Sequence, residues 1–143
     1  MNTTSARKVS VRDRILIMGS EPGWGENLVS VFENAGFSVA RVQASVETVV
    51  RPDVLKPDMV ILDEDVTNSM DVCFQYATSQ IPVILVGDEP GQEIWRKALE
   101  EAGADFYLRK PFDHEILIAR VKAILRRYKK RRTVDTGGNR VGS

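Results

Sequence analysis

The chain has 143 residues, which fits one domain of ordinary size, and its 43% hydrophobic and 28% charged residues lie close to the globular average. This composition excludes global disorder, and the single cysteine excludes a disulfide-stapled scaffold. The apolar runs are far shorter than the roughly 20 residues of a membrane span, and the start shows no secretory leader pattern, so we expect a cytoplasmic protein with no membrane association.

The formal net charge of zero combines an acidic body with a basic end. Residues 1–125 contain 13 Lys/Arg and 19 Asp/Glu, whereas residues 126–143 contain 7 and 1. The densest basic segment, 126–132, either completes a helix, where cations favour the macrodipole, or contacts nucleic-acid phosphates. We favour the first interpretation, in which the segment completes a helix, because no DNA-recognition helix or aromatic platform accompanies the basic cluster.

The first half of the chain predicts strands and helices in alternation. The compact apolar run 14–18 is typical of a buried strand, and the glycine-rich segment 19–25 after it predicts a loop. Apolar residues at helical spacing then predict a helix that ends at Gly36, where a left-handed residue is favoured. Residues 37–42 predict the second strand, and a weak second helix is expected around 46–50.

The second half continues the same alternation. The apolar run 59–62 predicts a buried third strand, which stops at three consecutive acids, 63–65. A last helix is predicted over 115–132, with Asp113 as its N-cap. The elements between them are a helix at 70–77, a strand at 81–86, a helix at 94–102 and a strand at 104–108. The expected inward face of the last helix consists of Leu117, Val121, Ile124 and Tyr128.

Five strands alternate with five helices, and the strands are continuous apolar runs, as expected when helices cover both faces of a parallel sheet. The sequence therefore predicts one α/β domain, a doubly wound parallel sheet, over residues 12–130. We expect residues 1–11 to be a flexible N-terminus and residues 131–143 to be a linker or disordered tail, since they lack apolar periodicity. Ligands of such sheets gather beyond the carboxyl ends of the strands, here at 19–25, 63–69, 87–91 and 109–113.

Three segments close to those strand ends resemble the receiver domain of bacterial two-component response regulators. They are PDMVILD at 57–63, IPVILV at 81–86 and GADFYLRKPF at 103–112. An aspartate that ends the third strand, together with Lys-Pro-Phe after the fifth, is specific to that family, and the match covers residues 12–130. The resemblance implies a flavodoxin-like (βα)5 fold with strand order 2-1-3-4-5.

The same resemblance assigns roles to three residues. Asp63 would be the phosphoacceptor, Lys110 the cation that contacts the phosphoryl group or the aspartate, and Tyr107 the aromatic switch whose ring moves when the phosphoryl group is bound. Attack on phosphorus requires charge neutralisation, so the family surrounds its aspartate with a lysine, a hydroxyl donor and Mg2+ held by acids. A sensor histidine kinase is the implied partner.

Two of the family's catalytic parts are missing from this sequence. Gly19 and Ser20 replace the adjacent acids that hold Mg2+ after strand one, and Gly87 replaces the Ser/Thr after strand four. Mg2+ requires hard, negatively charged oxygens, so we expect weak binding at most. The remaining candidate ligands are Asp63, Glu21 and Asp65. The resemblance thus implies an atypical receiver with a degenerate acidic pocket.

Asp63 and Lys110 have two interpretations. Either they form a partly buried ion pair that stabilises the loop, or they retain phosphoryl transfer, and we favour the structural pair. Glu64 and Asp65 are expected to form a solvated loop beside the pair.

The last helix resembles that of winged-helix, OmpR-type regulators, because ARVKAILRR at 119–127 is close to their usual ending. This resemblance implies a homodimer through helix four, strand five and helix five, and a DNA-binding output domain outside this chain. Helix four contains one extra residue within 99–102, which would shift the register of its charges. The charges that would serve the dimer are Glu93, Lys97, Asp105, Arg120 and Lys122.

Two functions follow from these observations. The first is the receiver domain of a response regulator in a phosphorelay that controls transcription. The second is a phosphorylation-independent pseudo-receiver that dimerises or binds another protein. An enzyme or flavin carrier is disfavoured because only Asp63 and Lys110 converge, so we expect no enzymatic activity and no cofactor besides weak Mg2+.

Overall fold

The computed structural model describes residues 12–20, 25–43, 56–88, 93 and 96–142, with side chains up to residue 130. The elements are β1 (Arg14–Gly19), α2 (Glu26–Asn34), β2 (Ser38–Gln43), β3 (Met59–Asp63), α4 (Ser69–Thr78), β4 (Val83–Gly87), the π-helical turn η1 (Lys97–Glu101), β5 (Phe106–Arg109) and α6 (His114–Gly142). The weak helix predicted around 46–50 and the predicted flexible segment 1–11 lie outside the described residues.

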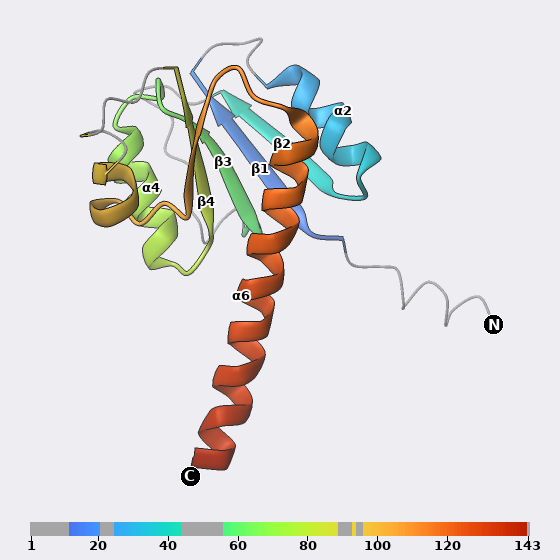
Figure 1. The fold of residues 1–143 in the computed structure, drawn as a ribbon, viewed down its shortest axis with the longest axis vertical. Helices are drawn as coiled ribbons and strands as arrows, with labels where there is room; N and C mark the ends of the chain where they lie inside the picture. The colour runs from blue at the N-terminus through green and yellow to red at the C-terminus, as the bar shows by residue number, and fades with distance from the viewer. Residues whose placement is uncertain (1–11, 21–24, 44–55, 89–92, 94–95, 143) are drawn as a thin grey trace, which may run out of the picture.

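The five strands form one parallel sheet in the order β2-β1-β3-β4-β5, which confirms the predicted doubly wound, flavodoxin-like fold. The strand ends are aligned by the pairing register, in which Met18 is opposite Leu62 and Asp63 is opposite Val86. The carboxyl ends of all strands point to the upper edge in Figure 1. The loops that follow the strands therefore meet at one edge of the sheet, as the sequence predicts.

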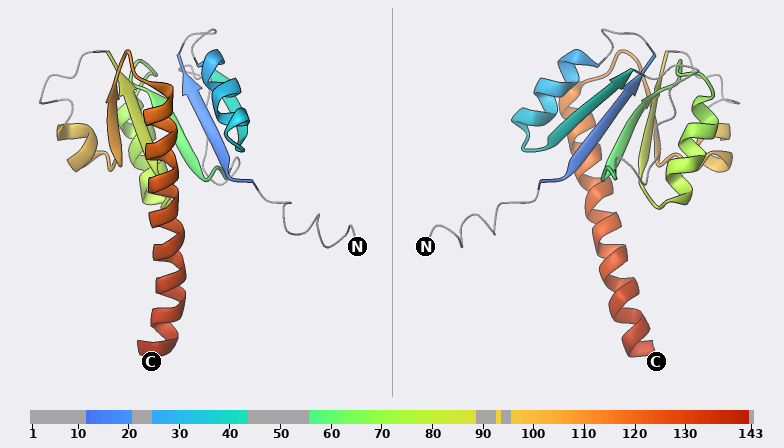
Figure 2. Two further views of the ribbon diagram at one scale, coloured as in Figure 1. Left: turned by 45° about the vertical axis from the view of Figure 1, so that its right-hand side comes forward. Right: turned by 180° about the vertical axis from the view of Figure 1, so that it is seen from behind.

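Helices cover both faces of this sheet: α2 and α6 lie on one face, and α4 and η1 on the other (Figure 2). Successive residues of each strand alternate between the two faces. In β1, Ile15 and Ile17 pack with α2 and α6, whereas Leu16 and Met18 pack with α4 and η1. All four side chains are at most 1% exposed. Two buried faces explain why the strands are continuous apolar runs rather than alternating patterns.

Capping geometry confirms the predicted end of α2 and the predicted start of α6. α2 ends at Asn34, and Gly36 after it has φ +98°, a left-handed conformation that favours glycine. The Asp113 carboxylate accepts hydrogen bonds from the N–H groups of Glu115 (2.7 Å) and Ile116 (3.4 Å) at the start of α6. Local sequence signals thus determine where both helices begin or end.

The turn η1 has an unusual hydrogen-bond pattern. The Ala102 N–H donates to the Lys97 carbonyl at 2.9 Å, which is an i to i+5 contact. Such a turn holds one residue more than an α-helical turn. It overlaps the segment 99–102, where the family resemblance predicts one extra residue, and Ala98 and Ala102 are both buried.

α6 continues to Gly142, whereas the sequence predicts a linker or disordered tail from residue 131. The segment contains no proline, and each glycine in a helix interior costs only about 1 kcal/mol, so nothing in it forces the helix to end. Leu117, Val121 and Ile124 are buried, as predicted, and Tyr128 is partly buried. Among the described residues, no helix combines the length and the apolar character needed to cross a membrane, α6 with its 29 residues included.

Asp105 connects three elements at the amino end of β5. Its carboxylate accepts hydrogen bonds from the Val83 N–H at 3.0 Å and from the Tyr128 hydroxyl at 2.9 Å, and its own N–H donates to the Val83 carbonyl at 2.8 Å. The side chain therefore joins β4 to α6.

We expect Asp105→Ala to lower the free energy of unfolding by about 1–3 kcal/mol, because it leaves the Val83 N–H and the Tyr128 hydroxyl without their acceptor. Urea unfolding followed by circular dichroism measures the change. Asp71→Ala removes an exposed carboxylate on α4 and serves as the matched control, with no comparable loss expected. Equal stability of the two variants would contradict this role of Asp105.

Candidate functional site

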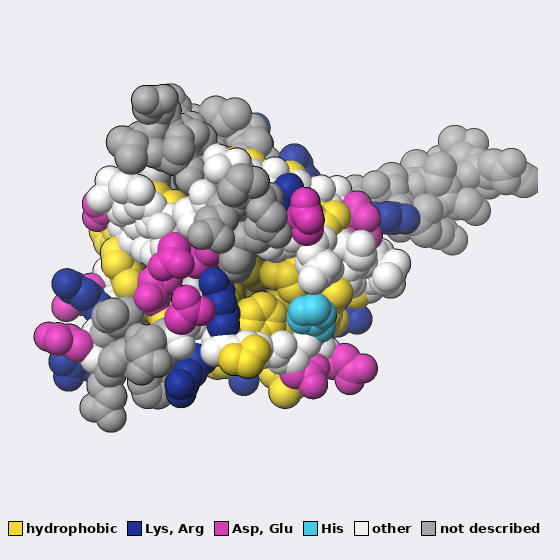
Figure 3. Space-filling model, turned by 90° about the horizontal axis from the view of Figure 1, so that it is seen from above, with side chains coloured by type: hydrophobic (Ala, Val, Ile, Leu, Met, Phe, Trp, Pro, Cys, Tyr) yellow, Lys and Arg dark blue, Asp and Glu magenta, His cyan; other side chains and the backbone are white. Residues whose placement is uncertain are grey.

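The site lies where the carboxyl ends of β3, β4 and β5 meet. Asp63 is the last residue of β3, Gly87 the last of β4, and Lys110 follows β5 directly. The Lys110 N–H donates to the Gly87 carbonyl at 2.8 Å, which holds the start of this loop against β4. Figure 3 looks onto this end of the molecule, where acidic side chains gather beside basic ones.

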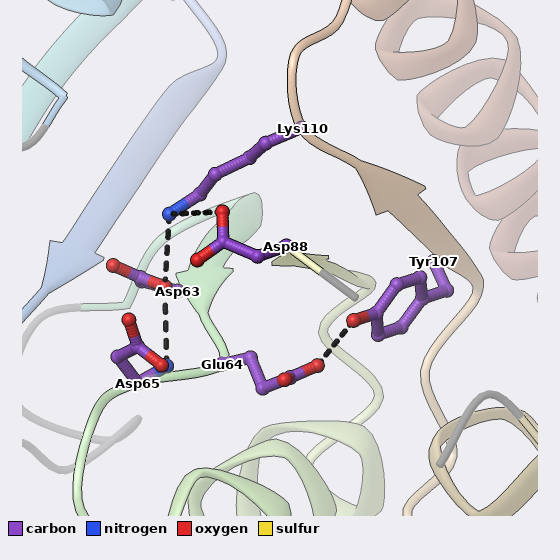
Figure 4. Close-up of polar contacts among 6 residues, drawn as sticks. All are labelled: Asp63, Glu64, Asp65, Asp88, Tyr107 and Lys110. Atoms are coloured by element: carbon purple, nitrogen blue, oxygen red, sulfur yellow. Dashed lines mark hydrogen bonds and ion pairs between the residues drawn. The ribbon is translucent and has the colours of Figure 1, made fainter. Parts of the chain in front are cut away.

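Asp63 and Lys110 are brought together, as the resemblance implies. The Lys110 ammonium lies 3.5 Å from Asp63 Oδ1 and 4.0 Å from Asp88 Oδ1, so one cation bridges two carboxylates (Figure 4). Asp63 Oδ1 also accepts the Asp65 N–H at 3.1 Å. Asp63 is only 2% exposed, whereas the Asp88 side chain is 69% exposed. The pair is thus a buried carboxylate held by a partly exposed lysine.

Burial raises the pKa of Asp63 above its ordinary value of 3.8. The Asp65 N–H and the Lys110 charge act in the opposite direction, since both stabilise the carboxylate, but the loss of hydration is the larger effect. The carboxylate of Asp65 adds to the increase. Ionised Asp63 is therefore less favourable in the folded chain than in the unfolded chain.

The raised pKa of Asp63 gives a pH-dependent prediction. As pH rises through about 4, the unfolded chain ionises first, so the contribution of Asp63 to stability falls between its unfolded and folded pKa values. We expect Asp63→Asn to increase Tm at pH 7 and the increase to shrink as pH is lowered towards about 4. Thermal unfolding across this pH range measures it. Asp88→Asn, at an exposed carboxylate, is the control with little change, and a lower Tm of Asp63→Asn at pH 7 would contradict the prediction.

Tyr107 and Glu64 meet beside Gly87. The Tyr107 hydroxyl donates a short hydrogen bond to Glu64 Oε1, and the ring is turned inward, only 7% exposed (Figure 4). A Cβ atom at Gly87 would overlap both the hydroxyl and Glu64 Oε1, and would lie 2.8 Å from Glu64 Cδ. The contact therefore exists only because residue 87 has no side chain.

Burial raises the pKa of Tyr107, and the hydrogen bond to Glu64 and the Glu64 charge raise it further. The hydroxyl stays protonated at neutral pH and acts as the donor. The prediction of a solvated loop at Glu64 is wrong, because its side chain is part of a half-buried contact with Tyr107. The missing side chain at Gly87 was the one sequence signal for this contact, because it leaves space next to the third strand.

We expect Gly87→Ala to lower the free energy of unfolding by only about 0.5–1.5 kcal/mol, because the new methyl group displaces the ends of the Tyr107 and Glu64 side chains and breaks the hydrogen bond between them. Combined with Tyr107→Ala, which vacates this space, the loss should be clearly smaller than the sum of the two single losses. Urea unfolding of the four chains gives the coupling. The same cycle with Leu28→Ala, on the other face of the sheet, should be additive.

The donor set does not fit a strongly bound Mg2+. Gly19 and Ser20 supply no carboxylate, and Asp63 Oδ1 already accepts from Lys110 and Asp65. In the part of the chain that the structure describes, acids, histidines and cysteines do not form any group of three that could hold a metal ion. Glu21 lies outside the described residues. No step of a mechanism is therefore derived through Mg2+.

Other predicted residues lie away from this site. Cys73 is fully buried, and burial raises its pKa to about 12, so it packs as a protonated thiol. Arg120 stacks over the Phe106 ring at 4.4 Å on the β5 side of α6. Lys122 lines a groove with Phe37, which is on the α2 side. Arg120 and Lys122, two of the charges expected to serve a dimer, therefore lie on different sides of α6.

Comparison with known proteins agrees with this geometry. The family model described as "Response regulator receiver domain" matches residues 15–122. The chain belongs to the response regulator receiver domain family. The DNA-binding response regulator MtrA of Mycolicibacterium smegmatis is 34% identical over 121 residues, with 82% of this chain and 53% of MtrA covered. The DNA-binding dual master transcriptional regulator RpaA of Synechocystis sp. is 35% identical, with 80% and 49% covered. The chain thus spans about half the length of these relatives.

Solved receiver structures share the fold. The BeF3-activated receiver domain of DrrB has a TM-score of 0.66 and 26% identity, with 81% of this chain and 99% of that chain covered. Another structure of DrrB is described as that of a Thermotoga maritima OmpR/PhoB homolog. These similarities support the OmpR-type resemblance that the last helix predicts.

Proposed function

We propose that this chain is the receiver domain of a response regulator with a DNA-binding output, and that Glu64, rather than a phosphoryl group on Asp63, determines the position of Tyr107. The observation that carries the proposal is the Tyr107–Glu64 hydrogen bond in the space next to Gly87. In the family that the chain belongs to, a hydroxyl residue stands where Gly87 is found here. Glycine has no hydroxyl that could donate a hydrogen bond to a phosphoryl group on Asp63.

Charge supports the same proposal. Glu64, Asp65 and Asp88 surround Asp63, and the Lys110 ammonium contacts Asp63 and Asp88 (Figure 4). A phosphoryl group would add roughly two negative charges to this acidic environment at neutral pH. With Gly19 and Ser20 in place of metal-binding acids, little would neutralise that charge. Phosphorylation of Asp63 is therefore disfavoured.

The position of Tyr107 would be transmitted through β5. This strand lies at the edge of the sheet, between η1 and α6, and carries Phe106 under Arg120. We infer that η1, β5 and α6 form the surface through which the domain contacts a second copy or an output domain. MtrA and RpaA are named as DNA-binding proteins, and α6 extends past the sheet as a helix suited to connect such a domain (Figure 1).

Retained phosphorylation is the second candidate, and the Asp63–Lys110 contact favours it. The acceptor carboxylate and its cation are both present at the edge where the chemistry would take place. A sensor histidine kinase would then be the partner, and Asp63, Glu21 and Asp65 would have to hold Mg2+ weakly.

Incubation with acetyl phosphate and Mg2+, followed by intact-mass measurement, separates the two candidates. We expect no phosphoryl adduct on the original chain, because metal ligands and the hydroxyl donor are missing. Gly19→Asp/Ser20→Asp restores the two acids and is expected to increase adduct formation. Asp63→Asn is the control that cannot accept the group. A stoichiometric adduct on the original chain, absent from Asp63→Asn, would reject the proposal in favour of phosphorylation.

Hydrogen exchange tests the Glu64 part of the same proposal. Glu64→Ala removes the acceptor of the Tyr107 hydroxyl, so amides of β5 and η1 should exchange faster without any phosphorylating agent. Asp65→Ala, which removes the neighbouring exposed carboxylate, is the matched control and should leave them unchanged. Identical exchange rates in both variants would mean that Glu64 does not determine the position of Tyr107, which would contradict the proposal.

A further inference from the structure

A groove lies at the opposite end of the sheet from Asp63, beside the amino ends of β1 and β2. Its volume is about 360 Å³. Three parts of the chain form it: the segment before β1, the turn between α2 and β2, and one side of α6. The lining residues are Arg12, Asp13, Ala35, Gly36, Phe37, Lys122, Leu125, Arg126 and Lys129.

The charge of this groove is strongly positive. Four of its lining side chains are cations and one, Asp13, is an acid. Asp13 Oδ2 lies 2.9 Å from the Lys129 ammonium, so its charge is already compensated. Arg12, Lys122 and Arg126 form no ion pair with any residue in the described ranges. Three cations thus face one shallow space without a counter-charge, and an anion that binds there removes their mutual repulsion.

The helix positions bring these cations together. Lys122, Arg126 and Lys129 are four and three residues apart, which places them on one face of α6. Arg12 approaches from the segment before β1. The cations therefore surround the groove from two sides, which is a different arrangement from a basic helix that is solvated on all sides.

The floor of the groove is apolar. Phe37 is 6% exposed and Leu125 is 3% exposed, and Ala35 completes the floor. A volume of this size is at the lower end of the range of ligand sites, about 300–1,000 Å³. The groove can therefore take one or two apolar side chains between its cations. A partner that fits must carry negative charges and an apolar group close together.

We propose that this groove docks an acidic, amphipathic peptide segment of a partner protein. Carboxylates of the segment pair with Arg12, Lys122 and Arg126, and an aliphatic or aromatic side chain lies on Phe37 and Leu125. A nucleic-acid backbone matches the charge but has no group for the apolar floor. A charge-complementary peptide satisfies both features, and the surface is separate from Asp63, so this proposal does not depend on the state of the phosphorylation site.

Fluorescence anisotropy with the intact chain tests the proposal at physiological salt. The probe is a fluorescein-labelled peptide with repeating Glu-Glu-Leu-Leu, and the comparison probes are Glu-Glu-Ser-Ser, Lys-Lys-Leu-Leu and a random double-stranded DNA. We expect saturable binding of Glu-Glu-Leu-Leu alone. Lys122→Glu/Arg126→Glu should weaken it at least tenfold. Asp13→Asn, which removes the competing carboxylate, should strengthen it several-fold.

Arg96→Glu/Lys97→Glu makes the same charge change on two exposed residues, the one before η1 and the first of η1, and should bind as the original chain does. Circular dichroism verifies that each variant is folded, and amide NMR shifts of the original chain should concentrate around Phe37 and Leu125. Absence of peptide binding, equal weakening in both double variants, equal affinity for Glu-Glu-Ser-Ser, or tighter binding of DNA than of the peptide would each overturn the proposal.

Discussion

The arrangement of the site depends on the absence of a side chain at Gly87. Because no Cβ occupies the end of β4, the Tyr107 hydroxyl and the Glu64 carboxylate meet there across two strands. The tyrosine ring is buried, and Glu64 is partly buried. The Tyr107 ring thus lies inward with its hydroxyl on a carboxylate of the protein itself, which is the contact on which our proposal for Glu64 rests.

Much of this fold could be predicted from the sequence, because its signals are local. Apolar runs identify the strands, Gly36 ends α2 and Asp113 begins α6. The meeting of Asp63 and Lys110 follows from the strand order that the family resemblance supplies. The contact between Glu64 and Tyr107 could not be predicted in the same way, because it depends on the direction that the Glu64 side chain takes directly after β3.

The helical continuation of α6 shows a second limit of sequence patterns. A segment without apolar periodicity has no core to pack against, so periodicity predicts a tail. A helix already begun on the sheet needs no further nucleation, however, and each added residue contributes one backbone hydrogen bond. The structure therefore extends α6 through Gly142, well beyond Tyr128, which packs against the core.

The two ends of the molecule are physically connected through α6. Its first turn follows Lys110 and is capped by Asp113, and its later turns carry Lys122 and Arg126 beside the basic groove. Tyr128 on the same helix is bonded to Asp105 before β5, the strand that carries Tyr107. A ligand at one end can change the other only if it binds two arrangements of α6 with different affinity. An occupant of the groove would contact α6 directly, and it therefore has the means to make such a difference without any chemistry at Asp63.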